Sequence, residues 1–286
     1  MFSNIIKKRV EKYSALKLDL KNNKVKFNDF NNLFEIKLNK KEFENIKKLV
    51  IKYIAKNIKV FFNNNNKNFI TISKLQKDIL ALPNITPNGV IKPKKEVIKE
   101  YKKLQIEIFK ILKKKKILKN IFMCEFVEVR LMRSNLYKYN SSRPYSSSKI
   151  HSDSWSGNPC DAKVALYILG DKKNTIQFYS PKKIDTGFFK KKINYESAIK
   201  KYGYTKIKKF NTNYLTIFDQ SCLHKTLNYN CGLRISIDFG MIVSKNINKS
   251  SFSNRYKNNF FKPKNKEAIN NIFKKQKFKS MFDKSF

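Results

Sequence analysis

The chain of 286 residues is poor in the features that mark secreted and membrane proteins. Its four cysteines form no C-x-x-C pair, and its first twenty residues carry no continuous apolar segment of the kind found in a secretory signal. No apolar run approaches the roughly 20 residues that span a bilayer. We therefore expect a reduced, soluble, cytoplasmic protein without a membrane span.

Acidic residues are also scarce, with 21 Asp and Glu against 63 Lys and Arg and a net charge of +42. Such a charge favours nucleic acid or another polyanion as a partner. However, only six of the basic residues are Arg, which is the residue best suited to bidentate phosphate and base recognition. Lysine is spread along the whole chain together with Asn, Ile and Phe, which indicates a coding bias. A basic nucleic-acid-binding protein is therefore kept only as an alternative.

Apolar residues make up 41% of the chain, enough for a large core. Residues 1–120 are predicted to be a mainly helical region. One helix should follow Asn39 as its N-cap, and a second should run from Lys95 to Lys116. The first has apolar residues at spacings of three and four, namely Phe43, Ile46, Val50, Tyr53 and Ile54. Asn63–Asn66 and the loop from Pro83 to Gly89 should separate the two helices.

Residues 121–243 are instead predicted to form strands, because short β-branched and aromatic runs recur between turn residues. The runs span 122–129, 164–169, 175–180, 214–218 and 233–243. This pattern favours a β-sandwich or barrel over a parallel sheet. Residues 244–286 form a basic C-terminal extension with one predicted helix, Lys266–Met281. The three regions together are expected to form one α+β structural unit.

Histidine is the scarcest residue that can bind a metal, with only His151 and His224 in the chain. In an extended strand His151 and Asp153 would point to the same face. His224 follows the YLTIF run and should lie at a strand end or in the next turn. Two histidines and one carboxylate on one face of a metal are the ligand set of non-haem Fe(II) oxygenases, which leaves positions open for a 2-oxo acid and O2.

Arg234 lies ten residues after His224 in an apolar strand, where a buried guanidinium needs an anionic partner. It could bind the second carboxylate of a 2-oxo acid bidentately, and Ser236 on the same face could donate a further hydrogen bond. Two alternatives remain open. Arg234 could pair with Asp238 across the sheet face, and Ser236 could be an ordinary strand residue.

These motifs resemble the Fe(II)/2-oxoglutarate-dependent dioxygenase superfamily, and most of all its phytanoyl-CoA dioxygenase-like branch. The resemblance covers about residues 121–243 and rests on HSDSW, YLTIFDQ, His224, Asn228 and Arg234-Ile235-Ser236. It implies a double-stranded β-helix, or jelly roll, with N-terminal helices packed on it. It also implies that His151, Asp153 and His224 are the catalytic iron ligands, and that Arg234 binds 2-oxoglutarate. Succinate and CO2 would be released, with ascorbate as a reductant.

The substrate is expected to be a small molecule such as a lipid, a sugar or a natural-product precursor, and an anionic one stays open. Its specificity should depend on the loops 137–149 and 185–210. Trp155 could line the substrate pocket or pack its own loop. Cys222 is expected to be a core residue and not a ligand. A cupin-like metal-binding isomerase or sensor, which would not need Arg234, is a further alternative.

Overall fold

The computed structural model describes residues 4, 7, 33–62, 82–86, 88–117, 121–132, 146–158, 160–170, 175–189, 193–209, 213–227, 233–243 and 260–261. Several predictions fall outside these residues. They are the break at Asn63–Asn66, Asn228 of the motif, the polar residues 137–145 and the helix Lys266–Met281.

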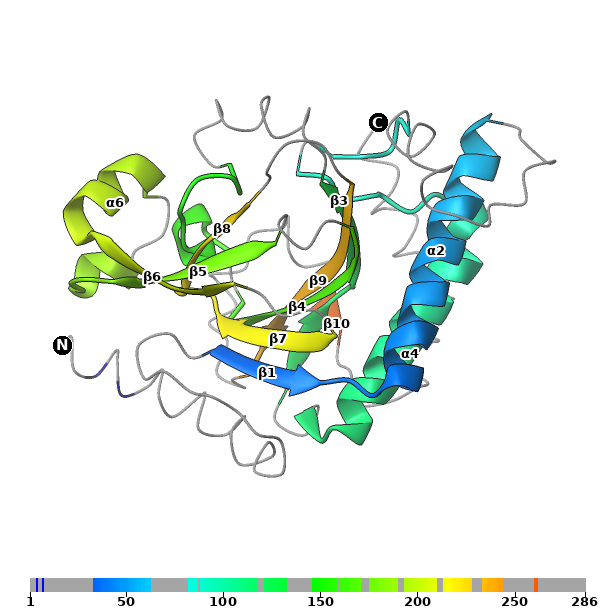
Figure 1. The fold of residues 1–286 in the computed structure, drawn as a ribbon, viewed down its shortest axis with the longest axis horizontal. Coiled ribbons are helices and arrows are strands. Elements are labelled where there is room, and N and C mark those ends of the chain that lie inside the picture. Colours follow the sequence, from blue (N-terminus) through cyan, green and yellow to red (C-terminus); the bar gives the residue numbers. More distant parts are fainter. Residues whose placement is uncertain are drawn as a thin grey trace.

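Two antiparallel sheets form the centre of the described fold (Figure 1). The larger sheet has the order β1-β7-β4-β9-β2-β10, and β3 also pairs with β9. The smaller sheet has the order β6-β5-β8, and an isolated bridge between His151 and His224 extends it beyond β8. The strands of the larger sheet are β1 (Leu33–Lys37), β2 (Met123–Glu125), β3 (Glu128–Met132), β4 (Ala162–Leu169), β7 (Tyr214–Asp219), β9 (Arg234–Ile242) and β10 (Phe260–Phe261). Those of the smaller sheet are β5 (Ile176–Pro181), β6 (Tyr204–Lys209) and β8 (Leu223–Thr226).

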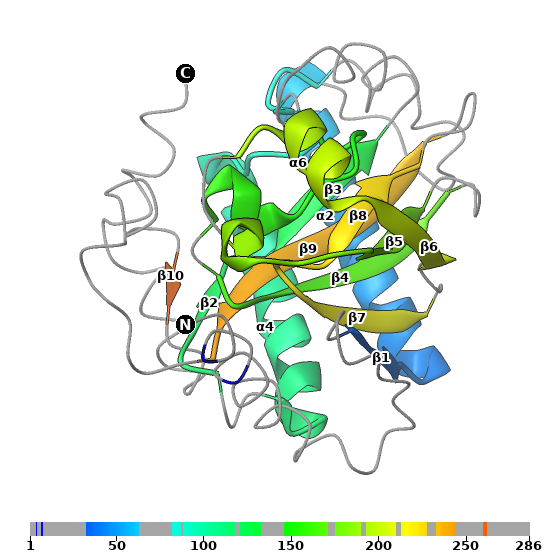
Figure 2. The same cartoon turned by 90° about the vertical axis from the view of Figure 1, so that its left-hand side faces the viewer.

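From β3 onward the chain passes repeatedly between the two sheets. β3, β4, β7 and β9 belong to the larger sheet, whereas the His151 bridge, β5, β6 and β8 belong to the smaller one. Figure 2 shows β5, β6 and β8 in front of β4 and β9. Residues about 70 positions apart, such as His151 and His224, therefore become neighbours. The fold is a mixed α+β arrangement, as the sequence predicts.

The long helices α2 (Lys40–Phe62) and α4 (Ile98–Lys114) pack on each other and on the outer face of the larger sheet (Figure 1). The predicted N-cap at Asn39 is confirmed. Its Oδ1 accepts from the backbone N–H of Glu42 at 2.8 Å, and its own N–H donates to Glu42 Oε2 at 3.1 Å. This reciprocal capping box satisfies two N–H groups at the start of α2.

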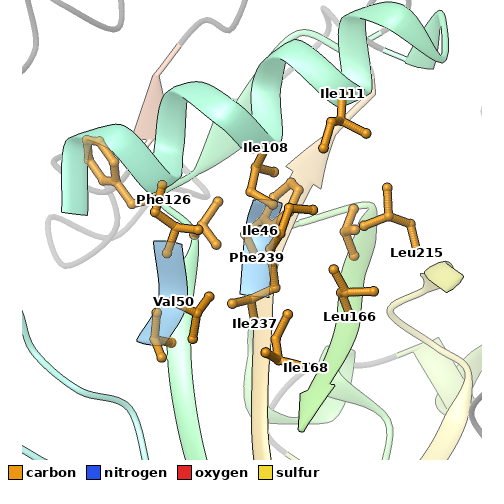
Figure 3. Close-up of a cluster of buried hydrophobic side chains, with 14 of the residues drawn as sticks. Ile46, Val50, Ile108, Ile111, Phe126, Leu166, Ile168, Leu215, Ile237 and Phe239 are labelled. Atoms are coloured by element: carbon orange, nitrogen blue, oxygen red, sulfur yellow. The ribbon is translucent and has the colours of Figure 1, made fainter. Parts of the chain in front are cut away.

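The main core lies between these helices and the sheet (Figure 3). Ile46 and Val50 of α2 and Ile108 of α4 meet alternate residues of the strands, and Phe109 packs edge-on against Phe239 with ring centroids 5.9 Å apart. Burial of each large aliphatic side chain contributes about 1.5–3 kcal/mol. Because this face of the sheet is apolar, the opposite face of the same strands is left for polar residues.

The prediction of one strand over 122–129 is wrong, because Phe126 and Val127 interrupt the strand and separate β2 from β3. The buried Gln105 of α4 replaces the lost sheet bonds: its Oε1 accepts from Val127 N at 2.8 Å and its Nε2 donates to Val127 O at 3.0 Å. The predicted helix Lys95–Lys116 begins with a 3-10 turn, Lys95–Val97, and its α-helical part ends at Lys114.

Several further elements were not predicted. β1 lies in the region expected to be helical and pairs with β7. The predicted loop 185–210 contains the helix α6 (Tyr195–Tyr202) as well as β6. His224 lies within a strand of its own, β8.

None of the helices in the described part of the chain has the length and apolar character needed to cross a membrane.

Candidate metal centre

His151 and His224 are held side by side by the backbone. The N–H of each residue donates to the carbonyl oxygen of the other at 2.9 Å, which makes a one-residue antiparallel bridge. Their ring centroids lie 4.4 Å apart. β8 is in turn paired with β5, where Phe178 faces His224 in the register. The strand pairing thus brings together two histidines that are distant in the sequence.

Both imidazoles are oriented by the backbone. Nδ1 of His151 lies 2.8 Å from the carbonyl oxygen of Lys149, and Nδ1 of His224 lies 3.0 Å from that of Cys222. Since a carbonyl only accepts hydrogen bonds, each Nδ1 must carry a proton, so that in the neutral form of either ring the lone pair is on Nε2. Burial, followed by repulsion from His151, lowers the pKa of His224 to about 4, so this ring is neutral at physiological pH. Neutral imidazole is the form that binds metals.

Asp153 completes the group, but not from an extended strand. Ser152 is extended, with φ −108° and ψ 134°, and Asp153 is the first residue of a 3-10 helix that ends at Gly157 with φ 84°. The carbonyl oxygen of Gln220 anchors this turn by accepting from Ser152 Oγ at 2.8 Å and from Ser154 N at 3.1 Å. The predicted strand geometry is therefore wrong for Asp153. The turn nevertheless directs its carboxylate toward the histidines.

The three side chains fit a divalent metal ion. Asp153 Oδ1 lies 3.7 Å from His151 Nε2 and Asp153 Oδ2 lies 3.9 Å from His224 Nε2, and one ligand atom from each residue lies within 4.8 Å of the others. Ligands about 2.1 Å from a metal at right angles are about 3 Å apart, so inward shifts of less than 1 Å would complete the site. Asp153 Oδ2 is buried without a hydrogen bond. A buried carboxylate oxygen that accepts no hydrogen bond and lies beside two imidazole rings is a suitable arrangement for a metal ligand.

Cys222 does not take part through its sulfur. Its carbonyl oxygen orients His224, whereas its side chain packs in an apolar cluster with Phe178, Phe218 and Ala165. This agrees with the core role predicted for Cys222. The ligand set is therefore nitrogen and oxygen, without a soft thiolate.

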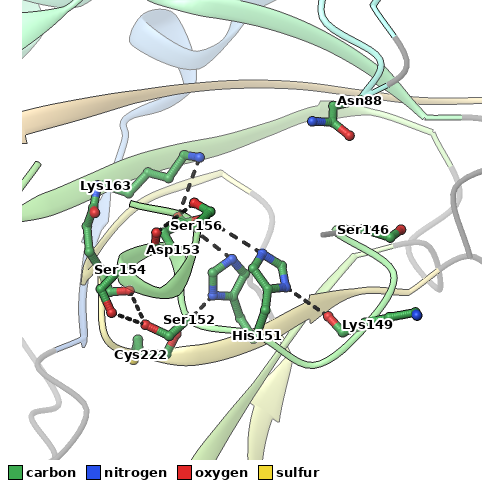
Figure 4. Close-up of polar contacts among 12 residues, drawn as sticks. Asn88, Ser146, Lys149, His151, Ser152, Asp153, Ser154, Ser156, Lys163 and Cys222 are labelled. Atoms are coloured by element: carbon green, nitrogen blue, oxygen red, sulfur yellow. Dashed lines mark hydrogen bonds and ion pairs between the residues drawn. The ribbon is translucent and has the colours of Figure 1, made fainter. Parts of the chain in front are cut away.

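Sequence reasoning missed a half-buried ionic group beside Asp153 (Figure 4). Lys163 Nζ lies 3.5 Å from Asp153 Oδ2 and 3.8 Å from Asp238 Oδ2. Burial by itself would raise the pKa of Asp153, but Lys163 and the two histidines hold it well below its usual value. One signal was present in the sequence. Lys163 and Val164 are neighbours in a strand and therefore face opposite sides of the sheet. The side of Val164 is apolar, so Lys163 points to the other side, toward the site.

Asp238 has its own partner, Arg130. The guanidinium donates from Nε to Asp238 Oδ2 at 2.9 Å and from Nη2 to Oδ1 at 3.2 Å. Asp238 therefore forms its ion pairs with Arg130 and Lys163, and the alternative in which it pairs with Arg234 is not observed among the described residues. Arg130 is therefore engaged in this pair.

Arg234 lies on β9, on the face that the larger sheet turns toward the smaller one. It is 2% exposed, and its Nε has no hydrogen-bond partner. Burial, followed by repulsion from Arg130, lowers its pKa to about 10, so it remains a cation at neutral pH. Ser236 is buried two residues further on, opposite Tyr167 of β4 and Arg130 of β3 in the register. A buried guanidinium with an unsatisfied N–H is costly, and none of the described residues accepts a hydrogen bond from this Nε.

Trp155 is fully buried and packs against Phe188, with its Nε1–H donating to the Phe188 carbonyl at 2.8 Å. This agrees with the alternative in which Trp155 packs its own loop. The aromatic cluster around it also contains Tyr195, which stacks on His151 with ring centroids 4.9 Å apart and planes 14° apart.

No family model matches the chain, and no curated protein matches it. Among solved structures, the chain is similar to the non-heme monooxygenase ThoJ in its nickel complex, with 10% identity and a TM-score of 0.33 over 79% of this chain and 77% of that chain. The apo form of ThoJ gives 11% identity with the same coverage and TM-score. At these values the likeness assigns neither fold nor activity, so the function rests on the residues of the site.

Proposed function

We propose that the chain is an Fe(II)- and 2-oxoglutarate-dependent oxygenase that hydroxylates a small molecule. Three side chains, His151, Asp153 and His224, would hold the iron. Two neutral imidazoles and one carboxylate are the ligand set of non-haem Fe(II) oxygenases, and they leave coordination positions open. When bound, the iron would supply the activation of O2. One oxygen atom would enter the substrate as a hydroxyl group and the other would enter succinate, with CO2 released from 2-oxoglutarate.

The jelly-roll assignment belongs to the same proposal. Its support is the strand order, in which β3, β9, β4 and β7 are neighbours in one sheet while the His151 bridge, β8, β5 and β6 follow one another in the second. This back-and-forth pairing of eight segments in two sheets is typical of a jelly roll. The phytanoyl-CoA dioxygenase-like branch stays a prediction.

The observation that carries the 2-oxoglutarate part is Arg234. A buried guanidinium with an unpaired Nε destabilises the protein unless an anion binds there. The distal carboxylate of 2-oxoglutarate matches the planar guanidinium, and Ser236 can donate a further hydrogen bond. The two ends of the cosubstrate would then be fixed by different groups, with the 2-oxo acid end at the metal and the distal end at Arg234. A cupin-like isomerase or sensor would have no use for this cation.

The chain's own residues would also protect the reaction from water. His224 is enclosed by Phe178 and Phe218, whose ring centroids lie 6.2 Å and 5.2 Å from it, and the wall of this side is apolar. The Lys163 ammonium beside Asp153 would help to keep the carboxylate ionised, which a metal ligand requires.

The test is titration calorimetry of 2-oxoglutarate into the iron-loaded protein without O2. We expect binding by the wild type and a loss of roughly tenfold to a hundredfold in Arg234→Gln, because a charge-assisted bidentate contact is removed. Arg130→Gln is the matched control, since Arg130 is already paired with Asp238 and should affect affinity much less. If the iron-loaded wild type binds no 2-oxoglutarate, or if Arg234→Gln binds it equally well, the proposal is wrong.

A further inference from the structure

The two histidines of the proposed metal site are held by different parts of the fold. His224 is surrounded by residues of the two sheets, Phe178 on β5 and Phe218 on β7. His151 instead faces α6, a helix that lies outside both sheets (Figure 2). One of its hydrogen bonds, from Nδ1 to the Lys149 carbonyl, fixes the position of one ring atom. That bond orients the ring through one edge atom, and a second contact, on the face of the ring, would further hold its plane.

Tyr195 supplies this second contact. Its ring lies nearly parallel to the His151 imidazole, with centroids 4.9 Å apart and an angle of 14° between the planes. Tyr195 is 3% exposed and cannot move away without opening the aromatic cluster that also holds Trp155. Offset stacking of this kind is specific in its geometry, in contrast to simple apolar contact.

The fold fixes Tyr195 in place at the start of α6. Asn194 caps the helix by accepting from Ser197 N at 3.1 Å, which makes Tyr195 its first residue. Ile193 N donates to the Trp155 carbonyl at 3.2 Å, so the chain entering α6 is tied to the turn that carries Asp153. An exposed ion pair of 2.6 Å between Lys149 and Glu196 adds a weaker link to the segment that carries His151.

We infer that Tyr195 is a positioning residue for His151, and that the docking of α6 and metal binding stabilise each other. This inference rests on the metal site of the proposed function. By thermodynamic linkage, any factor by which the docked helix tightens metal binding is also the factor by which the metal stabilises docking. Residues that orient a metal ligand typically change metal affinity by about tenfold to a hundredfold when they are replaced.

The test compares Co(II) binding by titration calorimetry in the wild type, Tyr195→Phe, Tyr195→Leu and Phe188→Leu. Tyr195→Phe keeps the stacked ring and should retain the affinity, whereas Tyr195→Leu should weaken it about tenfold or more. Phe188→Leu is the matched control, because Phe188 packs against Trp155 and Tyr202 in the same cluster but makes no ring contact with His151. It should lower stability and leave the Co(II) affinity near that of the wild type.

Hydrogen exchange on the unmodified protein gives a second readout that does not depend on the variants folding. The backbone amides of Ser197–Gly203 should exchange more slowly with Co(II) than without it. Equal Co(II) affinity in Tyr195→Leu and the wild type, an equal loss in Phe188→Leu, or unchanged exchange in α6 would overturn the inference while leaving the metal site intact. Failure of the wild type to bind Co(II) at all would overturn both the inference and the proposed function.

Discussion

The ammonium nitrogen of Lys163 lies 3.5 Å from Oδ2 of Asp153, a side chain that we propose as a metal ligand. The same nitrogen lies 3.8 Å from Asp238, which is also bound by Arg130. Charges of opposite sign therefore alternate from Arg130 through Asp238 and Lys163 to Asp153. These residues come from three neighbouring strands and the turn that carries Asp153. Together they keep Asp153 ionised in the metal-free protein.

Replacing Lys163 by Met should destabilise the metal-free protein, because two largely buried carboxylates lose the cation between them. Both ion-pair partners retain some exposure, so we expect a decrease of about 1–3 kcal/mol in the free energy of unfolding. A divalent ion would then offset more repulsion than in the wild type. Urea unfolding with and without Co(II) should show a larger metal-induced gain in Lys163→Met, and Lys163→Arg should behave like the wild type. An equal gain in Lys163→Met and the wild type would contradict this role.

Arg234 should lower the stability of the ligand-free protein and enable ligand binding. In the absence of ligand its guanidinium is a buried cation whose Nε has no partner, and an apolar side chain of similar length removes that cost. Arg234→Met should therefore raise the free energy of unfolding of the ligand-free protein by about 1–2 kcal/mol and abolish stabilisation by 2-oxoglutarate. Thermal unfolding with and without 2-oxoglutarate measures both effects. A variant that is less stable than the wild type without ligand would show that Arg234 has a structural partner.

The buried His224 and the half-buried Glu125 should give the metal-free protein opposing responses to pH. The pKa of His224 is lowered to about 4 by burial and by His151. Its contribution to the free energy of unfolding is therefore present above its pKa of 6.5 in the unfolded chain, and it is lost as the pH falls toward 4. Burial, and then Glu128, raises the pKa of Glu125 to about 7. Its contribution is present below the unfolded value of 4.5 and is lost as the pH rises toward 7.

Glu125→Gln should therefore remove the opposing effect and leave the pH dependence of stability that comes from His224. Between pH 7 and about 4.5 the free energy of unfolding of this variant should fall by about 2 kcal/mol, measured by urea unfolding with a chelator present. This range stays above the region where Asp153 and Asp238, whose pKa values are lowered, are protonated. Adding His224→Gln should remove the fall. A Glu125→Gln profile that is flat over this range would refute the assignment of His224 as a buried neutral imidazole.

Local patterns predicted those parts of the fold that depend on local chemistry. The apolar spacing and the cap at Asn39 predicted α2, and β-branched and aromatic runs between turn residues predicted β4, β7 and β9. The residues that we propose as metal ligands were indicated because the chain contains only two histidines. In contrast, β1 forms because it pairs with β7, about 180 residues later in the chain, and no local signal specifies such a partner.

The contacts around the site also could not be predicted from the sequence. Asp153 was expected on a strand because H-x-D fits alternation, but the backbone carbonyl of Gln220 holds this segment in a turn. The pairing of Arg130 with Asp238 and the stacking of Tyr195 on His151 join residues 108 and 44 positions apart. Contacts of this kind depend on the packing of whole sheets and helices, so single-residue patterns do not reveal them.

The most direct measurement is succinate formation from 2-oxoglutarate in the presence of Fe(II), ascorbate and O2. The wild type should form succinate, slowly when no substrate is present, whereas His224→Ala should lose the metal and Arg234→Ala should lose the cosubstrate. Both variants should therefore fall to the rate of the iron-free control. Equal succinate formation by all three proteins, or none by the wild type when iron is bound, would contradict the assignment of this chain as a 2-oxoglutarate-dependent oxygenase.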